Sequence, residues 1–390
     1  MQTTIAILGR QPAISRAELE AVFGASAVRP ISDLSVELQV EPSDLKIENL
    51  GGTIKSAKVL TYLETIKWPE LIDYVGRTLP DHLKFIPEGK IKFGLSAYGL
   101  SVTANDLNKS GLRLKKVIKA KGRSVRVVPN TEIELNSAQV LHNQLTSPVG
   151  LELLFIRDGN RTILAQTMGV QDITSYTVRD RGRPKRDAKV GMLPPKLAQV
   201  IINLAVANAP APQIVLDPFC GTGVILLESL LMGHKAYGTD VDKRMVSYAT
   251  ENVDWLEHRF QIDQPSMTEA GDARKHVWKP FDTVAAETYL GEPLVAAPSH
   301  AHLEEIVRGV DQLHREALEN LAKQLKPKQR LCLAVPAWRL KVRFKHLPCL
   351  DDLEKLGYTR LSFAHASNEE LIYFREEQFV ARELVVLERK

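Results

Sequence analysis

The residues best suited to chemistry form a glycine-rich segment in the second half of the chain. Residues 217–223 read Asp-Pro-Phe-Cys-Gly-Thr-Gly and separate a predicted strand (213–216) from a predicted helix (224–232). Glycines let the backbone approach a ligand closely, and a helix N-terminus offers free N–H groups. The segment has neither the GxGxxG pattern of dinucleotide sites nor the GK[ST] of P-loops, so pyrophosphate binding is disfavoured. The alternative is a turn whose glycines serve only backbone geometry.

Two more carboxylates follow predicted strands. Asp240 comes 23 residues after Asp217, where a carboxylate binds ribose hydroxyls in doubly wound folds. Asp242 is then a candidate N-cap for the next helix. Asp272, in Gly-Asp-Ala after another strand, is placed to accept from an adenine amino group, although a plain turn is equally compatible. The predicted cofactor-binding residues are Asp217, Pro218, Phe219, Cys220, Gly221, Thr222, Gly223, Asp240, Val241, Asp272 and Ala273.

The elements that must position these residues alternate between strand and helix from residue 211 onward. Strands separated by helices predict a doubly wound, mostly parallel sheet, with an antiparallel pair near the C-terminus. The further predicted elements are strands at 236–239, 283–286, 331–335 and 381–387, and a helix at 245–255.

The first half of the chain reads as smaller α/β units. A strand at 4–8 precedes a helix for which Ser15 is the expected N-cap, with Glu18 completing a capping box. Alternating elements follow to residue 170 and include a hairpin around Asp158-Gly159-Asn160. Residues 171–195 are polar and contain prolines, as expected of a linker.

Basic residues are concentrated in one part of the chain. Residues 101–190 hold 16 Lys+Arg against 8 Asp+Glu, although the net charge of the whole chain is only +4. Residues 113–121 combine a basic helix face with apolar positions that face a core. This asymmetry indicates a polyanionic partner, with a solvated helix face as the alternative. The predicted RNA-binding residues are Arg113, Lys115, Lys116, Lys119, Lys121, Arg123, Arg179, Arg181, Arg183, Lys185 and Arg186.

Composition excludes several classes of protein. The 390 residues are 44% hydrophobic and 25% charged, which is typical of a globular protein and not of a disordered or fibrous chain. Three cysteines without CxxC spacing predict neither a disulfide framework nor a metal site. The first residues lack the pattern of a secretory signal and no apolar run could cross a membrane, so we expect a cytoplasmic protein.

The motifs at 217–223, 237–242 and 271–273 resemble the S-adenosyl-L-methionine motifs of class I methyltransferases. More narrowly, the chain is similar to the THUMP-domain tRNA guanosine-N2 methyltransferases, which modify guanosine 10 of tRNA. Residues 6–23, 179–205 and 373–387 carry this similarity. The resemblance implies an α/β chain with a ferredoxin-like/THUMP α+β module followed by a Rossmann-like methyltransferase domain. It also implies S-adenosyl-L-methionine as cofactor, tRNA as partner and, for some members, a small activator protein.

The resemblance implies four segments: an N-terminal ferredoxin-like unit (1–60), a THUMP-like RNA-binding domain (61–170), a basic linker (171–195) and a methyltransferase domain (196–390). In that family the catalytic loop usually reads Asp-Pro-Pro-Tyr-Gly, whereas this chain has Glu-Thr-Tyr-Leu-Gly at 287–291. Glu287 then takes the place of the Asp, and both prolines are missing. The implied catalytic residues are Glu287, Tyr289 and Leu290.

Glu287 suits a guanine base, whose N1–H and N2–H₂ donors lie side by side and match the two oxygens of a carboxylate. Tyr289 offers a ring for stacking on an extruded base, or packs in the core. We therefore expect methyl transfer to the N2 amine of a guanosine in tRNA. The alternative is a catalytically degenerate fold that binds tRNA as a partner or chaperone; DNA methylation is disfavoured.

Overall fold

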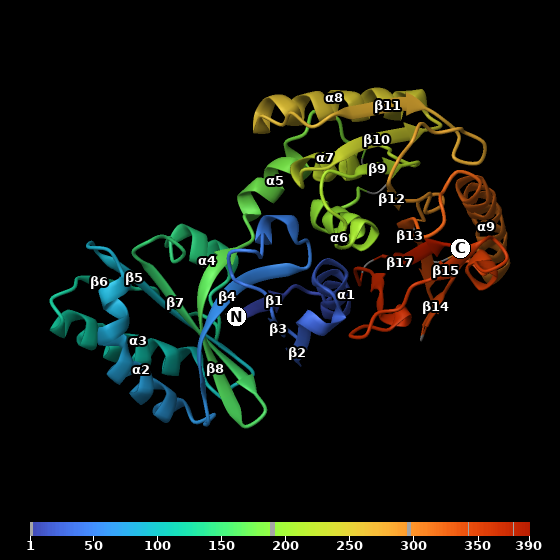
Figure 1. Ribbon diagram of the computed structural model, residues 1–390. Helices are drawn as coiled ribbons and strands as arrows, with labels where there is room; N and C mark the ends of the chain where they lie inside the picture. Colours follow the sequence, from blue (N-terminus) through green and yellow to red (C-terminus); the bar gives the residue numbers. More distant parts are fainter. Residues whose placement is uncertain (1–2, 188–191, 295–297, 342, 377) are drawn as a thin grey trace. The chain divides into compact units, whose positions relative to one another are not determined.

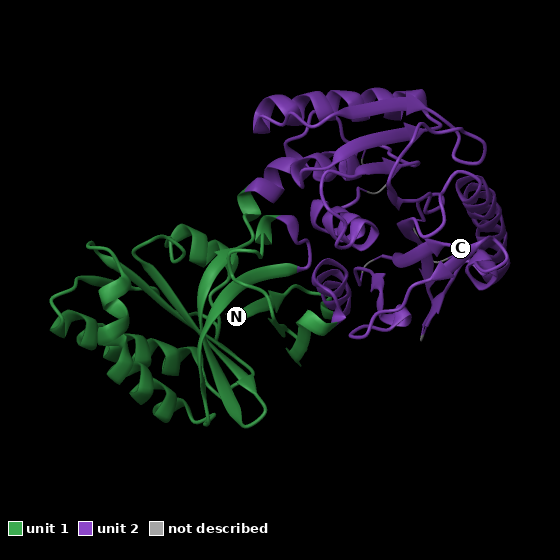
Figure 2. Cartoon of the chain, in the orientation of Figure 1, with its two compact units in different colours: residues 1–12, 26–48, 53–174 green, residues 13–25, 49–52, 175–390 purple. Residues whose placement is uncertain are grey.

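The computed structural model describes residues 3–187, 192–294, 298–341, 343–376 and 378–390. The chain forms two compact units, coloured separately in Figure 2. Unit 1 contains residues 1–12, 26–48 and 53–174, and unit 2 contains residues 13–25, 49–52 and 175–390. No helix within the described ranges is long and apolar enough to cross a membrane.

Unit 1 is built on one eight-stranded sheet (Figure 1) in the order β2-β3-β1-β4-β8-β7-β5-β6. Helices α2 and α3 pack against each other and against β5 and β7 through a shared apolar cluster. The strands are β1 (Thr4–Leu8), β2 (Val28–Ser32), β3 (Ser35–Leu38), β4 (Thr53–Leu63), β5 (Ile91–Tyr98), β6 (Val125–Val127), β7 (Gly150–Asp158) and β8 (Arg161–Val170). The helices are α2 (Trp68–His82), α3 (Ala104–Ala120) and α4 (Ser137–His142).

The boundary expected at residue 60 falls inside β4, which differs from the predicted division. β4 pairs with β1 on one side and with β8 on the other, so residues 1–60 and 61–170 contribute to one sheet. Strand pairing across residue 60 joins the two segments by backbone hydrogen bonds, a constraint that composition does not reveal. The hairpin predicted around Gly159 is confirmed as the antiparallel pair β7–β8.

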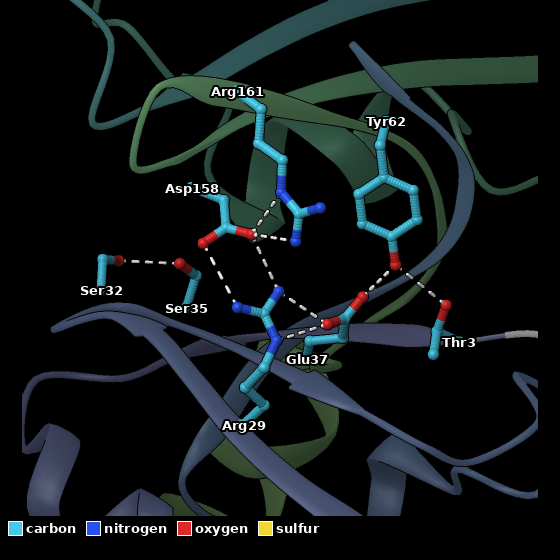
Figure 3. Close-up of polar contacts among 8 residues, drawn as sticks. All are labelled: Thr3, Arg29, Ser32, Ser35, Glu37, Tyr62, Asp158 and Arg161. Carbon is cyan, nitrogen blue, oxygen red and sulfur yellow. Dashed lines mark hydrogen bonds and ion pairs between the residues drawn. The ribbon is translucent and has the colours of Figure 1, made fainter. Parts of the chain in front are cut away.

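A polar network ties the N-terminal strands to the β7–β8 turn (Figure 3). Arg29 of β2 donates to Glu37 at 2.7 Å and to both oxygens of Asp158 at 3.2 and 2.9 Å. Arg161 also donates to Asp158, and its guanidinium lies 4.9 Å from the ring of Tyr62. Because β2 and β7 are not neighbours in the strand order, the sheet must curl to bring Arg29 and Asp158 together.

Unit 2 contains a second, mostly parallel sheet in the order β11-β10-β9-β12-β13-β17-β15. β13 and β17 are antiparallel, as predicted for the C-terminal pair. The strands are β9 (Ile214–Asp217), β10 (Lys235–Asp240), β11 (Ser266–Ala270), β12 (Thr283–Glu287), β13 (Arg330–Arg339), β14 (Phe344–Lys345), β15 (Tyr358–Arg360), β16 (Ile372–Tyr373) and β17 (Val380–Arg389). The helices are α1 (Pro12–Phe23), α5 (Ile173–Arg181), α6 (Pro195–Val206), α7 (Val224–Leu231), α8 (Lys243–Phe260) and α9 (His300–Ala322).

Both faces of this sheet are covered by helices. Val284 and Leu333 pack with α9, whereas the alternate positions Ala285 and Ala334 pack in the cluster that contains α1 and α6. Successive side chains of a strand point to opposite faces, so these two clusters are the two sides of the core. Burial on both faces explains why the strand sequences are almost continuously apolar.

Helix α1 differs from its prediction in both start and role. It begins at Pro12, so Ser15 lies inside it and donates its hydroxyl to the carbonyl of Gly52 at 2.9 Å. Glu18 is fully buried and accepts N–H groups of Gly51 and Gly52 at 2.8 Å each, and the side-chain amide of Asn203 at 2.8 Å. Glu18 therefore joins α1 to residues 49–52 and to α6 by hydrogen bonds and does not form the expected capping box.

The linker predicted over 171–195 is partly helical, because α5 begins at Ile173, and residues 188–191 lie outside the described residues. Arg179 is buried and donates to Glu228 at 2.8 Å. Arg183 is also buried, only 3% exposed. Both are predicted RNA-binding residues, and their burial removes them from the surface. A polar composition does not distinguish a solvated linker from one packed on a domain.

Candidate active site

A cavity of about 520 Å³ lies at the carboxyl ends of the parallel strands of unit 2. It spans the point between β9 and β12 where the strand order reverses, the usual place for a ligand in doubly wound sheets. The predicted site residues that line it are Asp217, Pro218, Phe219, Cys220, Gly221, Thr222, Asp240, Val241, Asp272, Ala273, Glu287, Tyr289 and Leu290.

Gly223 is not among the residues that line the cavity, although it was predicted to bind cofactor. It caps the N-terminus of α7 with a φ of +85°, and a Cβ there would lie 3.2 Å from Ala249 of α8. A side chain would be strained by the left-handed backbone and crowded by α8. Gly223 thus shapes the turn, while the residues before it face the cavity.

Asp240 holds the glycine-rich turn as well as facing the cavity. One carboxylate oxygen accepts the N–H of Gly221 at 2.9 Å, and the other accepts the N–H of Asp242 at 2.9 Å. Asp242 in turn caps α8 through the N–H of Arg244 at 2.8 Å, which confirms its predicted N-cap role. Each oxygen of Asp240 keeps a further lone pair with which to accept from a ligand hydroxyl.

Carboxylates are concentrated at this end of the sheet. Asp217 is 2% exposed and accepts the N–H of Phe219 at 3.0 Å. Burial, reinforced by the negative charges of Asp240 and Glu287, raises the pKa of Asp217 well above its usual range. Burial also raises the pKa values of Asp240 and Glu287. Seven acidic residues line the cavity against two basic ones, Arg244 and Arg274, so the balance of charge favours a ligand that carries positive charge.

The segment that follows β11 also lines the cavity. Asp272 lines the cavity, but Arg274 donates to both of its oxygens at 2.9 and 2.8 Å. This pairing lowers the pKa of Asp272 and leaves only its remaining lone pairs for the predicted contact with an adenine amine. The backbone here is held from α9, because Asn320 donates to the carbonyls of Ala273 and His276 at 3.0 and 2.9 Å.

The loop at 287–291 is fixed at its first residue by an arginine that sequence reasoning missed. Arg382, from β17 and 5% exposed, donates its Nε to Oε1 of Glu287. Arg382 opposes the rise in the pKa of Glu287 that burial causes. The bidentate contact predicted between Glu287 and guanine must therefore share Oε1 with Arg382, which the two lone pairs of that oxygen allow.

Helix α9 also contacts the loop at 287–291. The Thr288 hydroxyl lies 2.7 Å from Nε2 of His314, whose Nδ1 lies 2.7 Å from the carbonyl of Val310. The N–H and the hydroxyl of Thr288 also lie 3.0 and 3.1 Å from the carbonyl oxygen of Ala334, which accepts from them. Burial lowers the pKa of His314 to about 4, so its neutral ring donates from Nδ1 to Val310 and accepts at Nε2. These contacts restrain the loop where the two prolines are missing.

Tyr289 and Leu290 follow the buried Thr288 in this loop. Tyr289 is 42% exposed and lines the cavity, so its ring is accessible and is not part of the core. The geometry therefore excludes the core-packing alternative considered for Tyr289. Gly291 closes the loop with a φ of +90°, beside Val310 of α9.

One further cavity residue comes from the segment at 179–205 and is not among the predicted site residues. Asp187 lines the cavity after a stretch held against α8, where Asn252 exchanges hydrogen bonds with the Lys185 backbone at 2.9 Å. Asn252 also donates to the carbonyl of Thr222 at 2.8 Å, which links this stretch to the glycine-rich turn. Only the folded chain reveals that contact, because Asn252 lies on α8, far from both partners in sequence.

The predicted RNA-binding residues have different environments. On and after α3, Lys116, Lys119 and Lys121 are exposed, Lys115 is half-buried and Arg113 pairs with Asp73 at 2.6 Å. Arg123 instead donates to backbone carbonyls of residues 83–87. In unit 2, Arg181 and Arg186 are exposed, whereas Lys185 pairs with Glu251 at 3.1 Å.

Sequence comparison relates part of the chain to tRNA-modifying enzymes. A family described as DNA methylase matches residues 172–251. The tRNA (guanine(10)-N2)-dimethyltransferase of Methanothermobacter thermautotrophicus is 33% identical over 147 residues, 37% of this chain and 39% of that one. The Pyrococcus abyssi protein of the same description is 30% identical over 170 residues, 43% of each chain. The chain thus spans about two fifths of the length of the curated relatives it matches.

Structural comparison extends over the whole chain. TrmN from Thermus thermophilus matches with a TM-score of 0.54 at 16% identity, covering 100% of both chains. SMU.472, a putative methyltransferase complexed with SAH, matches with a TM-score of 0.51 at 12% identity, covering 100% of this chain and 98% of the other. The chain has a methyltransferase fold. This confirms the predicted Rossmann-like class, and the resemblance to tRNA guanosine-N2 methyltransferases is confirmed over the aligned segments.

Proposed function

We propose that the chain transfers a methyl group from S-adenosyl-L-methionine to the exocyclic N2 amine of a guanosine in tRNA. The observation that carries the proposal is the meeting, in one cavity, of the strand-end carboxylates Asp217 and Asp240 with Glu287 and Tyr289. The names of the relatives, all tRNA (guanine(10)-N2)-dimethyltransferases, support the same reaction.

The cavity suits this cofactor electrostatically. S-adenosyl-L-methionine carries a sulfonium and an ammonium against one carboxylate, so its net charge is positive, whereas a dinucleotide is an anion. Asp240 favours the cation and keeps lone pairs for ribose hydroxyls, whereas the raised pKa of Asp217 favours its neutral form. When bound, the cofactor would supply an electrophilic methyl group.

The loop residues would orient the acceptor. Glu287 would accept hydrogen bonds from the guanine N1–H and N2–H₂ and so orient N2 toward the methyl group. Its carboxylate would then take the proton that N2 loses on methylation. The accessible ring of Tyr289 stacks on the extruded base. Catalysis by such a site depends on proximity and orientation and requires no covalent intermediate.

The lysine face of α3, defined as Lys115, Lys116, Lys119 and the C-cap residue Lys121, would contact phosphates of the tRNA. These lysines are paired with no carboxylate within the described residues, so their charge is available. Phosphate contacts position a nucleic acid without reading its sequence. We propose that the module around α3 is the THUMP-like RNA-binding domain and that the protein acts in the cytoplasm; the activator protein stays a prediction.

Single-turnover methylation tests the proposal on tRNA transcripts with guanosine or inosine at the target. Inosine lacks the N2 amine, so the wild-type protein should methylate only the guanosine transcript. Glu287→Gln should bind cofactor normally and lose about 100-fold or more in rate, as for a lost electrostatic contact at a reacting centre. Glu319→Gln, which removes an exposed carboxylate from α9, is the matched control.

Equal methylation of both transcripts would rule out N2 as the acceptor. A protein that binds cofactor and tRNA tightly but methylates neither transcript would favour the binding-only alternative.

A further inference from the structure

Glu292 is an acidic residue at the opening of the cavity in unit 2. It directly follows Gly291, lines the same cavity as Glu287 and Tyr289, and is exposed. A side chain that lines a cavity and also meets solvent lies where the cavity opens. Glu292 is therefore placed to contact a part of the substrate that stays outside the deepest part of the site.

Glu292 differs from the other carboxylates of the cavity in having no donor of its own. Each of the others accepts a backbone N–H or pairs with an arginine, as is the case for Asp187, Asp217, Asp240, Asp242, Asp272 and Glu287. Within the described residues, the carboxylate of Glu292 has neither a hydrogen bond nor an ion pair. Both of its oxygens are therefore available to a donor on the substrate.

A free carboxylate at this opening is unfavourable for a nucleic acid unless it meets a donor. The backbone phosphates are negatively charged, so Glu292 repels them. Its charge also acts on the site, because burial and then the charge of Glu292 raise the pKa of Tyr289, on whose ring the base would stack. A charge-assisted hydrogen bond from the target nucleotide itself would offset this repulsion.

The chemistry of guanosine indicates which donor this is. The N2 amine lies on the minor-groove edge of the base, and the ribose 2′-hydroxyl is displayed on the same side of the nucleotide. A site that receives N2 at Glu287 therefore brings the 2′-hydroxyl to the adjoining wall of the cavity, to which Glu292 belongs. The N1–H and N2–H₂ donors are already assigned to Glu287, which leaves the hydroxyl for Glu292.

We propose that Glu292 accepts a hydrogen bond from the 2′-hydroxyl of the target guanosine and so makes the site selective for RNA over DNA. This proposal rests on the proposed function and adds a specificity-determining residue to it. A deoxyribose has no hydroxyl to donate, so the same carboxylate would face only C–H groups and the nearby phosphates. Glu292 would then favour RNA by attraction and disfavour DNA by repulsion.

The test is single-turnover methylation, below saturation, of tRNA transcripts that carry guanosine, 2′-deoxyguanosine or 2′-fluoro-2′-deoxyguanosine at the target. The fluoro nucleotide keeps the sugar pucker of RNA but lacks the donor. The wild-type protein should methylate both transcripts without the hydroxyl about 10-fold more slowly or worse, as for a lost hydrogen bond to a charged group. Glu292→Ala should methylate all three transcripts at one reduced rate.

Two further variants separate this contact from a structural effect. Glu292→Gln keeps an acceptor oxygen without the charge, so its discrimination should fall between those of the wild type and Glu292→Ala. Glu319→Gln removes an exposed carboxylate of α9 and should discriminate as the wild type does. A variant that is only partly folded would slow all three transcripts and keep the ratio between them.

Equal rates of the wild-type protein on the three transcripts would overturn the role of Glu292 and leave the proposed function intact. An unchanged ratio in Glu292→Ala would also overturn it, because the 2′-hydroxyl would then be recognised by a different residue. If the wild-type protein methylates none of the transcripts, the proposed function itself fails, and the role of Glu292 fails with it.

Discussion

The Thr288 hydroxyl lies 2.7 Å from the buried Nε2 of His314, and Thr288 directly follows Glu287 in the chain. His314 is 2% exposed and Thr288 is 4% exposed, so water does not compete for the contact. This hydrogen bond connects the loop at 287–291 to α9. It restrains the backbone between Glu287 and Tyr289, where rigidity would otherwise come from proline.

Thr288→Val should slow single-turnover methylation about 10- to 100-fold with little change in cofactor affinity. Valine keeps the shape of threonine but leaves Nε2 of His314 without a donor, and a small displacement of reacting groups has a large effect on rate. Thr288→Ser should restore most of the rate because it keeps the hydroxyl. A wild-type rate in the valine variant would show that the loop does not depend on this contact.

Arg382→Gln should shift the pH dependence of the rate to higher pH. Burial raises the pKa of Glu287 and Arg382 lowers it, so removal of the cation raises it further and reduces the ionised fraction near neutrality. Single-turnover rates measured across pH should begin to fall at a higher pH than in the wild type, and activity should recover in alkaline buffer. A variant that is equally impaired at every pH would indicate a purely structural role for Arg382.

Asp240→Asn should weaken binding of S-adenosyl-L-methionine by about 10-fold or more, measured by calorimetry. Hydrogen bonds to a charged group contribute roughly 1.5–3 kcal/mol, and the substitution also disturbs the acceptor of the Gly221 N–H. Asp254→Asn, on the exposed side of α8, makes the same change of charge away from the cavity. Unchanged affinity in the Asp240 variant would remove this residue from the cofactor site.

Replacing Lys115, Lys116 and Lys119 by Gln should reduce the slope of log K against log salt for tRNA binding by roughly 2–3, if each contacts a phosphate. The control replaces Lys323, Lys326 and Lys328, three exposed lysines of unit 2, and should keep the slope. A wild-type slope in the first variant would leave the face of α3 as an ordinary solvated surface. Affinity lost without a change of slope would point to misfolding.

Glu18 should make unit 2 less stable as pH rises. Burial raises its pKa from 4.5 to about 7, against three N–H donors that favour ionisation. The folded state favours the neutral acid, so this contribution is complete below about pH 4.5 and is lost as pH rises through 7, by up to about 3 kcal/mol. Denaturant unfolding at several pH values should show this loss in the wild type and in Glu319→Gln, but not in Glu18→Gln. Parallel curves for all three proteins would contradict the shifted pKa.

The elements around the cofactor motifs were predictable because their causes are local. Strand-to-turn-to-helix transitions at Asp217 and Asp240 follow from apolar runs that end in a carboxylate or a glycine, and both occur as predicted. The capping box expected at Ser15 had the right local pattern, yet α1 begins at Pro12. There, contacts with Gly52, distant in sequence, outweigh a local preference.

The same distinction applies to the basic residues of 101–190 and to the loop at 287–291. Charge composition by itself determined that residues 101–190 are cationic, and the spacing of motifs determined which carboxylates reach one edge of a sheet. Only the tertiary structure decided that Arg179 is buried against Glu228, and that Arg382 and His314 support residues 287–288. Long-range partners are chosen by packing of the sheet and α9, and no local periodicity encodes which side chains that packing brings within hydrogen-bonding distance.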